Sequence, residues 1–392
     1  MQLFSSYNTL KTDINYNIAL YFYGGIGSVY EIELWKKNLE QLNEEEPLCV
    51  VVRDLKVFQY LEKTTDLALF YFYTIDDVLS FYEKQDFRVI LYVNNGFKNF
   101  QSLIYHRSMH IHINHDETEA VFMATNQAKG YDYLFVSGDA AVDRYRKNLI
   151  YFDFDKIIKI GRPHYDFIPS YSSNTLKKII LFTPANDLQS IPYLVLDMLI
   201  NNPKDYYLVY APYKIEKSLL SLTKKIEKDY EEAIIKNELD PENFDLKESV
   251  SVVDIQDKKF ASLVSAAHLV IMDYNIQRII ETLYFNKPLI LNDLPKDISN
   301  KFEISFLKNI SKVSLELGLL TISNIKNMPI KKLIEQELQD SYKDKQREKL
   351  RQYYYETTQQ GKSSKLFVEK ILQFVKQQEQ YLVDKNMLNT IH

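Results

Sequence analysis

The sequence lacks most features that mark secreted, membrane-spanning or nucleic-acid-binding proteins. Its 392 residues include one cysteine, so no internal disulfide can form, which is typical of a reducing cytoplasm. No apolar run reaches the roughly 18 residues of a membrane-spanning helix. The first 17 residues mix polar and charged side chains, which predicts no signal peptide. The net charge of −5 gives no global positive field for nucleic acid.

The chain is rich in the apolar and aromatic residues that form hydrophobic cores. Apolar residues make up 46% of it, with 30 tyrosines and 22 phenylalanines, and this composition excludes a disordered protein. The length is sufficient for two or three domains. The single cysteine, Cys49, lies in the apolar run LCVVVRD and is predicted to be a buried strand residue.

Short β-branched and aromatic runs alternate with helix-period segments, which predicts βαβ units and mostly parallel sheets. An amphipathic helix is predicted in SVYEIELWKKNLEQLN. The strands predicted in the N-terminal half are NIALYFYGG, LCVVVRD, LALFYF, RVILYVNNG, MHIHINH and YDYLFVSG. After a linker rich in Gly, Pro and Ser at residues 158–174, the pattern resumes with KKIILFTPA, DYYLVYAPY, SVSVVD, HLVIMDYN and NKPLILND.

This organisation predicts a GT-B-like α/β fold with two Rossmann-like domains, a cleft between them and a helical tail. The predicted divisions are residues 1–165, 166–329 and 330–392. Ligands of open α/β sheets bind beyond the carboxyl ends of the strands. The loops that follow predicted strands are therefore the expected site, namely residues 24–28, 94–96, 115–119, 184–186, 212–214 and 273–275.

The stretch YGGIGSVY begins the first predicted helix. Backbone amides at such a helix start can hold an anion. Tyr30 occupies the place of the third glycine of a dinucleotide-binding fingerprint, so that motif is excluded. A tight strand-to-helix turn is the simpler interpretation.

Three histidines crowd the stretch HIHINHDETEA. His110 and His112 share one face of a predicted strand, where packing in the sheet is favoured over a zinc site, and no metal site is predicted. His115 lies just past the strand end and precedes Asp116, Glu117 and Glu119. Neighbouring carboxylates raise the pKa of an imidazole and fix its tautomer, as a general base requires. The spacing alone nevertheless favours a residue without a catalytic role.

Two arginines and one strand-end loop are candidates for holding a nucleotide or phosphate. Arg144 and Arg162 could pair with phosphate, the alternative being surface ion pairs. Asp273 ends a predicted strand and could bind ribose hydroxyls, the alternative being a helix cap, and Glu281 lies in the following helix.

The C-terminal stretch QQGKSSKLFVEKILQFVKQ is not a P-loop, because the upstream glycine and strand are missing. Ser363 or Ser364 is predicted to cap a helix whose apolar stripe, Phe367, Ile371 and Val375, packs on the protein. Upstream, a basic run could contact anionic lipid, although a solvated helix face is the simpler interpretation; it comprises Lys343, Lys345, Arg347, Lys349 and Arg351.

Taken together, these blocks resemble the CDP-glycerol glycerophosphotransferases of teichoic acid and capsule synthesis. The resemblance is dense from YVNNGFKNF through HIHINHDETEA and TNQAKGYDYLFVSGDAAVDRY to GRPHYD, and weaker in MDYNIQRIIETLYFNKPLIL and QQGKSS. It implies a GT-B phosphotransferase in which an acceptor hydroxyl attacks the transferred polyol phosphate and CMP leaves. His115 matches the family's catalytic histidine.

The resulting hypothesis is transfer of a polyol phosphate from a CDP-activated donor to a glycan or lipid-linked acceptor by a divergent, cytoplasmic member at the inner face of the membrane. No tightly bound cofactor is expected, and the metal requirement is left open. The expected catalytic residues are His115, Glu117 and Arg144. The expected donor-binding residues are Arg162, Pro184, Tyr213, Lys214, Asp273, Tyr274, Asn275, Glu281, Gly361, Lys362 and Ser363.

Two alternatives stay open because the chain departs from the family pattern. Asp116 and Ala120 replace a glycine and a lysine beside His115, and Tyr213 or Lys214 replaces a second histidine. Extra carboxylates suit the oxocarbenium-like transition state of a glycosyltransferase that uses a nucleotide-sugar. The same losses would also fit a catalytically degenerate homologue that binds a partner.

Overall fold

The computed structural model describes most of the chain and divides it into two compact units. Unit 1 comprises Met1–Phe167 and Tyr353–His392, and unit 2 comprises Ile168–Gln352. The described residues are 14–114, 124–168, 176–184, 204–212, 224, 227–228, 231–232, 250–253, 260–273, 275–291, 320–321, 330–339 and 341–385.

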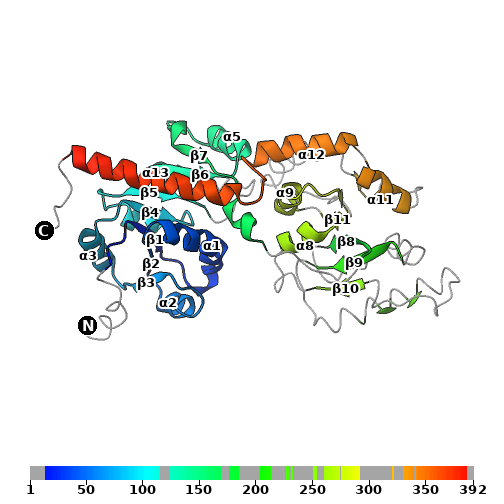
Figure 1. The fold of residues 1–392 in the computed structure, drawn as a ribbon, viewed down its shortest axis with the longest axis horizontal. Coiled ribbons are helices and arrows are strands. Elements are labelled where there is room, and N and C mark those ends of the chain that lie inside the picture. The colour runs from blue at the N-terminus through cyan, green and yellow to red at the C-terminus, as the bar shows by residue number, and fades with distance from the viewer. Residues whose placement is uncertain are drawn as a thin grey trace. The chain divides into compact units, whose positions relative to one another are not determined.

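Unit 1 is built on a parallel sheet of seven strands in the order β3-β2-β1-β4-β5-β6-β7 (Figure 1). The β1–β2 and β1–β4 registers align Ile18 with Leu48 and with Val89. The strands are β1 (Ile18–Phe22), β2 (Leu48–Val52), β3 (Ala68–Tyr71), β4 (Val89–Tyr92), β5 (Met109–His112), β6 (Tyr133–Val136) and β7 (Ile157–Lys159).

Helices cover both faces of this sheet, because the strands are apolar on both faces. One core packs α1 (Tyr30–Glu45), α2 (Leu55–Leu61) and α13 (Lys362–Asp384) on the sheet. The opposite core contains residues of α3 (Ile75–Gln85) and α5 (Asp139–Asn148). The remaining elements are α4 (Asn99–Ser102) and the 3-10 helices η1 (Ile26–Ser28), η3 (Asn126–Gly130), η4 (Phe154–Lys156) and η5 (Pro163–Phe167).

Unit 2 contains a second parallel sheet, of six strands in the order β10-β9-β8-β11-β12-β13. Its strands are β8 (Lys178–Thr183), β9 (Tyr206–Tyr210), β10 (Val250–Val252), β11 (Leu269–Met272), β12 (Leu289–Leu291) and β13 (Leu320–Thr321). Its described helices are α8 (Phe260–Ala266), α9 (Ile276–Tyr284), α11 (Ile330–Gln339) and α12 (Ser341–Tyr354), the last of which ends in unit 1.

The two parallel α/β sheets confirm the predicted fold class, and every quoted run that was predicted as a strand contains one. Cys49 is fully buried in β2, as predicted. Two short strands were not predicted. β7 falls at the start of the segment taken as a linker, and β13 consists of two residues, too few for a pattern.

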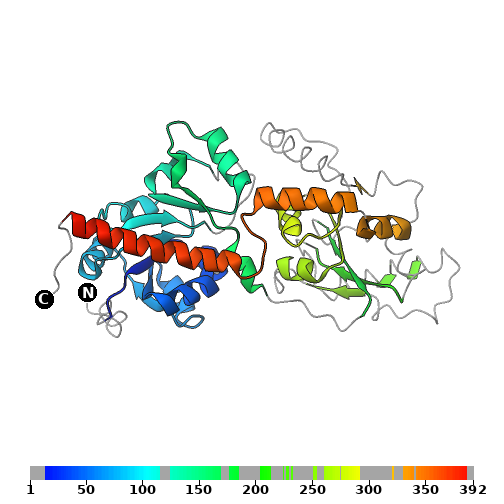
Figure 2. The same cartoon turned by 45° about the horizontal axis from the view of Figure 1, so that its top comes forward.

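The C-terminal segment differs from the expected separate tail. Figures 1 and 2 show α13 alongside α1 on the sheet of unit 1, whereas α11 belongs to unit 2. The stripe of Phe367, Ile371 and Val375 is buried in the core of unit 1, as predicted. Unit 1 is therefore closed by the end of the chain, about 200 residues after its own β7. Hydrophobic periodicity along the sequence predicts the helix but cannot predict that it packs on a sheet formed by residues about 200 positions earlier.

The N-terminus of α13 is held by buried hydrogen bonds. The Ser364 amide and hydroxyl both donate to Asp166 Oδ2, at 2.7 and 2.8 Å. Asn38 Nδ2 of α1 lies 3.0 Å from Ser364 Oγ, and the Arg162 amide donates to Ser363 Oγ at 3.2 Å. We call these contacts the serine clip. They correct the expectation of a serine cap, because Gly361 is the N-cap and the carboxylate of Asp166 caps Ser364.

Candidate functional site

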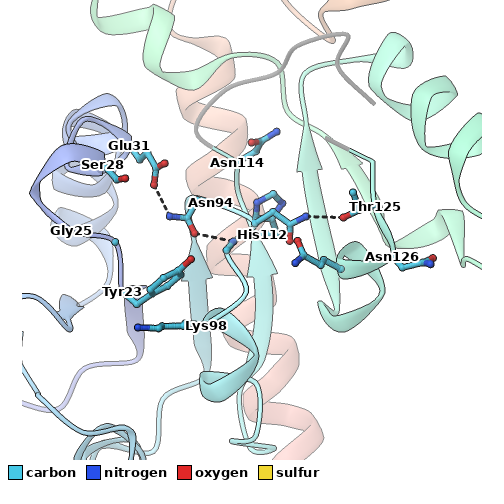
Figure 3. Close-up of a pocket in the computed structure, with 14 residues that line it drawn as sticks. Tyr23, Gly25, Ser28, Glu31, Asn94, Lys98, His112, Asn114, Thr125 and Asn126 are labelled. Carbon is cyan, nitrogen blue, oxygen red and sulfur yellow. Dashed lines mark hydrogen bonds between the residues drawn. The ribbon is translucent and has the colours of Figure 1, made fainter. Parts of the chain in front are cut away.

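A polar pocket of about 1020 Å³ lies in unit 1 at the carboxyl ends of β1, β4 and β5 (Figure 3). The chain order reverses beside β1, because β2 lies on one side of it and β4 on the other. Open α/β sheets bind ligands at such a switch point, where the loops diverge to opposite faces and leave a crevice. We call this site the strand-end pocket. Its lining comes from residues 23–31, 94–98, 112–114 and 125–127.

The loop after β1 supplies Tyr23, Gly24, Gly25 and Ser28, and the first turn of α1 supplies Glu31. This is the YGGIGSVY stretch, and it forms the tight strand-to-helix turn that was predicted, through η1. A carboxylate in the first turn of a helix is stabilised by the partial positive charge of the helix N-terminus. Glu31 is only 8% exposed, so its charge lies in the wall of the pocket.

The loop after β4 supplies Asn94, whose side chain links two walls of the pocket. Asn94 Nδ2 donates to Glu31 Oε2 at 2.5 Å, and Asn94 Oδ1 accepts from the Gly96 amide at 3.2 Å. The Asn94 carbonyl accepts from Asn99 Nδ2 at 2.6 Å. These bonds fix the loop, and Figure 3 shows Asn94 between Glu31 and the end of β5.

Gly96 permits close approach of two loops. A Cβ at this position would lie 2.2 Å from Tyr23 Oη, so a side chain would displace the tyrosine ring. Lys98 places its ammonium 5.8 Å from the centre of the same ring, within cation–π range. Burial and the charge of Glu31 raise the pKa of Tyr23, so the phenol is a neutral hydrogen-bonding group at physiological pH.

The histidines of β5 divide into a core residue and a pocket residue. His110 Nδ1 lies 2.8 Å from Tyr92 Oη, and His110 Nε2 lies 2.6 Å from the Tyr105 carbonyl. Burial lowers the pKa of His110, which keeps it neutral, and its predicted packing role is confirmed. His112 stacks on Tyr131, with ring centres 5.1 Å apart, and lines the pocket.

Asn114 ends the described part of this loop and also lines the pocket. Its backbone is left-handed, with φ of 59°. Across the pocket, Asn95 Nδ2 donates to Thr125 Oγ1 at 3.4 Å, and Asn126 and Gln127 complete the wall.

The chemistry of the lining is that of a site for hydroxyl groups. Side-chain amides and hydroxyls predominate, and each can both donate and accept hydrogen bonds. Among the described lining residues, Glu31 and Lys98 carry the formal charges. This composition suits a neutral, polyhydroxylated molecule better than a dense anion.

The predicted catalytic residues are only partly placed. His115 follows Asn114 in the sequence, but His115 and Glu117 lie outside the described residues. Arg144 is on α5 and is 8% exposed, so it is not the surface residue of the ion-pair alternative, and it does not line the strand-end pocket. Arg162 is 5% exposed, with its guanidinium 5.7 Å from the centre of the Tyr165 ring. Neither arginine is among the described residues that line the strand-end pocket.

Of the predicted residues of unit 2, the structure describes Pro184, Asp273, Asn275 and Glu281. Pro184 follows β8 and is buried, and Asp273 follows β11 and is half-buried. Asn275 caps α9 by accepting from the Arg278 amide at 3.2 Å, and Glu281 accepts from Arg278 Nη1 at 3.0 Å. Helix capping therefore belongs to Asn275 and not to Asp273. Tyr213, Lys214 and Tyr274 lie outside the described residues.

The predicted nucleotide turn at Gly361, Lys362 and Ser363 belongs to unit 1, whereas Asp273 and Asn275 belong to unit 2. Ser363 is completely buried, and its hydroxyl accepts from the Arg162 amide. It therefore packs in the serine clip instead of facing a ligand. Gly361 and Lys362 are exposed.

Several pocket residues were not predicted individually: Glu31, Lys98, His112, Asn114 and Thr125. Loops 24–28 and 94–96 were identified because they follow strands, and this signal was sufficient. Glu31 was not predicted because it lies inside a helix, and His112 was not distinguished because it lies on the same strand face as the core residue His110. In the part of the chain that the structure describes, no group of histidine, cysteine and carboxylate side chains could hold a metal ion.

No described helix has the length and apolar character needed to cross a membrane. No family model matches the sequence, and no curated protein matches it significantly. Solved structures do resemble it.

A UDP-N-acetylglucosamine 2-epimerase matches with a TM-score of 0.51 at 16% identity, covering 91% of this chain and 95% of its own. The wall teichoic acid polymerase TagF, soaked with CDPG, matches with a TM-score of 0.50 at 13% identity, covering 95% of this chain and 93% of its own. A glycosyltransferase from Rickettsia africae has a TM-score of 0.48 at 13% identity, with 93% and 99% covered. At such identities the likeness shows the fold and does not extend to the substrate. The chain has the two-unit, parallel-sheet architecture of the GT-B fold.

Proposed function

We propose that this protein is a transferase that moves a group from a nucleotide-activated donor to a hydroxyl of a polyhydroxylated acceptor held in the strand-end pocket. The leading donor is a CDP-activated polyol phosphate, so that the product is a glycan or lipid-linked acceptor extended by polyol phosphate. The GT-B fold is compatible with this chemistry and with glycosyl transfer, so the choice depends on the site.

The main support for the proposal is that three sequence blocks resembling the glycerophosphotransferase family line the same pocket. YVNNGFKNF contributes Asn94–Gly96 and Lys98, HIHINH contributes His112 and Asn114, and TNQAKGYD contributes residues 125–127. Three separate blocks that resemble glycerophosphotransferases thus line one pocket. A fold shared with unrelated functions does not by itself produce this convergence.

The lining supports a hydroxyl-bearing acceptor. Amide side chains from three loops can bind vicinal hydroxyls in both hydrogen-bonding directions. Glu31 adds a carboxylate, which accepts strong hydrogen bonds from hydroxyls and repels phosphate groups. We infer that the acceptor enters with a neutral polyol or sugar end.

In the proposed reaction, the acceptor oxygen forms a bond to the phosphorus of the polyol phosphate, and the phosphoanhydride bond to CMP breaks. The acceptor proton passes to His115, which directly follows the pocket residue Asn114 in the sequence. Proton removal by a positioned base contributes about 10²- to 10⁴-fold. Asp273, Lys214 and neighbouring strand-end residues of unit 2 are proposed for the nucleotide. In TagF, which is one of the fold neighbours, the ligand of the soaked structure is CDPG.

A second candidate is glycosyl transfer from a nucleotide-sugar. The observation in its favour is the charge of the pocket, where Glu31 is a carboxylate and Lys98 lies over the Tyr23 ring. Phosphoryl transfer places negative charge on equatorial oxygens and requires cationic or amide donors around them. An oxocarbenium-like transition state instead tolerates a nearby carboxylate.

The deciding experiment separates the nucleotides released from a donor panel. Purified protein is incubated with CDP-glycerol, CDP-ribitol and several nucleotide-sugars, each with and without a lipid-linked saccharide acceptor. Acceptor-dependent CMP is the expected product. Release of UDP or another nucleoside diphosphate from a sugar donor would move the protein to the second candidate. No release from any donor, combined with no nucleotide binding by calorimetry, would contradict both and favour a degenerate, partner-binding homologue.

A further inference from the structure

Helix α1 contacts two of the strand-end loops through one of its faces. Glu31 and Trp35 are four residues apart and so lie on the same side of the helix. Glu31 accepts from Asn94 Nδ2, after β4. Trp35 Nε1 donates to the Asn114 carbonyl, after β5, at 2.6 Å and across 79 residues of sequence. One helix thus holds two pocket asparagines, one by a carboxylate and the other by an indole.

The Asn114 end of this bond is conformationally unusual. Its φ of 59° is a left-handed conformation, which residues other than glycine rarely adopt and which asparagine tolerates best. Asn114 is 8% exposed and lines the pocket (Figure 3). A residue in this conformation persists where the surroundings determine it, and here a buried hydrogen bond to its carbonyl does so.

The Trp35 end is immobilised from two sides. Trp35 is 2% exposed, and its ring centre lies 5.0 Å from that of Phe367 on α13 and 6.0 Å from that of His164 on η5. The serine clip ties these same elements together, because Ser364 of α13 contacts Asp166 of η5 and Asn38 of α1. The C-terminal Gly-Lys-Ser-Ser stretch thereby fixes the indole that fixes Asn114.

We propose that Trp35 is a positioning residue for the strand-end pocket, which sets the backbone of Asn114 and thereby the direction in which its amide faces the acceptor. The proposal rests on the assignment of this pocket as the acceptor site. Packing alone does not account for an indole at this position. A phenylalanine would also present an aromatic ring to Phe367 and His164, but it has no N–H that could reach the Asn114 carbonyl.

The test uses the fact that the chain has one tryptophan, so its indole N–H gives a single, unambiguous NMR signal. The full-length protein is labelled with ¹⁵N in Trp and Asn. In the wild type, the indole N–H should exchange with solvent slowly. Trp35→Phe, which keeps a smaller aromatic ring and removes the donor, should shift the side-chain amide signal of Asn114. The matched control is Leu39→Val, one turn further along the same buried face of α1.

Leu39→Val should lower the melting temperature and leave the Asn114 signal in place. The proposal is overturned if Trp35→Phe leaves the Asn114 signal unchanged, or if Leu39→Val moves it equally. A second pair of variants works from the other end of the bond and does not require the Trp35 variant to fold. Asn114→Gly keeps the left-handed backbone, so the indole signal should stay. Asn114→Ala disfavours it, so the indole signal should move; an indole signal unaffected by both changes also overturns the proposal.

A kinetic readout separates this inference from the proposed function. With the active donor and acceptor, Trp35→Phe should raise the acceptor KM about tenfold and leave the donor KM within about twofold, whereas Leu39→Val should change neither. A tenfold change in KM corresponds to about 1.4 kcal/mol. If the NMR shifts occur while the wild type transfers nothing, the positioning role stands and the proposed reaction fails. If transfer occurs and Trp35→Phe raises both KM values equally, the positioning role fails.

Discussion

The two units share a strand order but differ in the described residues at their strand ends. In each sheet, the first strand of the unit lies between the second and the fourth, which creates a switch point at β1/β4 and at β8/β11. In unit 1 this point opens into a pocket of about 1020 Å³. At the corresponding point of unit 2, the described residues include Asn275, which caps α9, and Glu281 pairs with Arg278 within the same helix. Topology thus fixes where a site can form, and side chains decide what forms there.

The units also differ in how they are closed. Unit 2 is one continuous stretch of chain, whereas unit 1 needs residues 353–392 to complete the face of its sheet on which α1 lies. The closure is specific, because Gly161 and the serine clip allow α13 to approach η5 with no intervening side chain. Stability and site geometry are therefore coupled in unit 1, through Trp35, Phe367 and Ser364.

The largest expected effect is on the proposed reaction. His115→Ala should lower kcat by about 10²- to 10⁴-fold, as loss of a general base does, while the fold is kept. His106→Ala is the matched control, because His106 is exposed and does not line the pocket. Both variants are assayed for acceptor-dependent nucleotide release. Full turnover by His115→Ala would show that His115 is not the base.

The next effect tests the closure of unit 1. Gly161 and Gly361 both have positive φ, at +73° and +80°, but only at Gly161 would a Cβ meet a neighbour, Ser363 Oγ at 2.3 Å. Alanine at either site costs about 1 kcal/mol for the left-handed backbone. The steric overlap should add about 1–3 kcal/mol at Gly161.

Hydrogen exchange measured by mass spectrometry in each unit separates these costs. Gly161→Ala should accelerate exchange in α13 and β7 and leave β8 and β11 unchanged, and Gly361→Ala should have the smaller effect. Equal effects of the two variants would show that α13 docks loosely and that the serine clip is unimportant.

A third effect concerns alkaline pH. Burial raises the pKa of Tyr131 to about 12, above its ordinary value of 10. Between these values the unfolded chain loses the phenolic proton while the folded chain keeps it, so the free energy of unfolding falls as pH rises, by up to about 1.4 kcal/mol per pH unit. Below pH 10 the group contributes no pH dependence. Tyr131→Phe should make the decline of unit 1 between pH 10 and 12 shallower, as followed by urea denaturation, and an unchanged slope would contradict the burial argument.

The smallest effect distinguishes capping from binding in unit 2. Asn275→Ala should cost about 1 kcal/mol through the lost N-cap of α9, and Asn275→Asp should cost little. Thr74→Ala, at the N-cap of α3 in unit 1, is the matched control. If Asn275 only caps the helix, neither cap variant changes nucleotide affinity measured by calorimetry. Weaker nucleotide binding by Asn275→Ala alone would give unit 2 a binding strand end of its own.

Sequence reasoning predicted this fold well because its signals are local. Runs such as LCVVV and KIILF are apolar on both faces, which is typical of strands buried in a parallel sheet, and each was recognised from its own residues. The same locality explains the identification of loops 24–28 and 94–96, since a loop that follows a strand is recognised without knowing its neighbours. The separate roles of His110 and His112 could not be distinguished, because both lie on the same face of β5.

The sequence by itself determined the two parallel sheets, the strand ends at which the candidate pocket of unit 1 lies and the apolar stripe of the last helix. Only the tertiary structure decided that this helix closes unit 1, that Ser363 is buried against Arg162, and that Trp35 reaches Asn114. The physical reason is the sequence distance over which each kind of interaction acts. Hydrophobic periodicity and turn residues act over a few positions, whereas these contacts join residues separated by 79 to 326 positions, and their geometry exists only after the sheet has assembled.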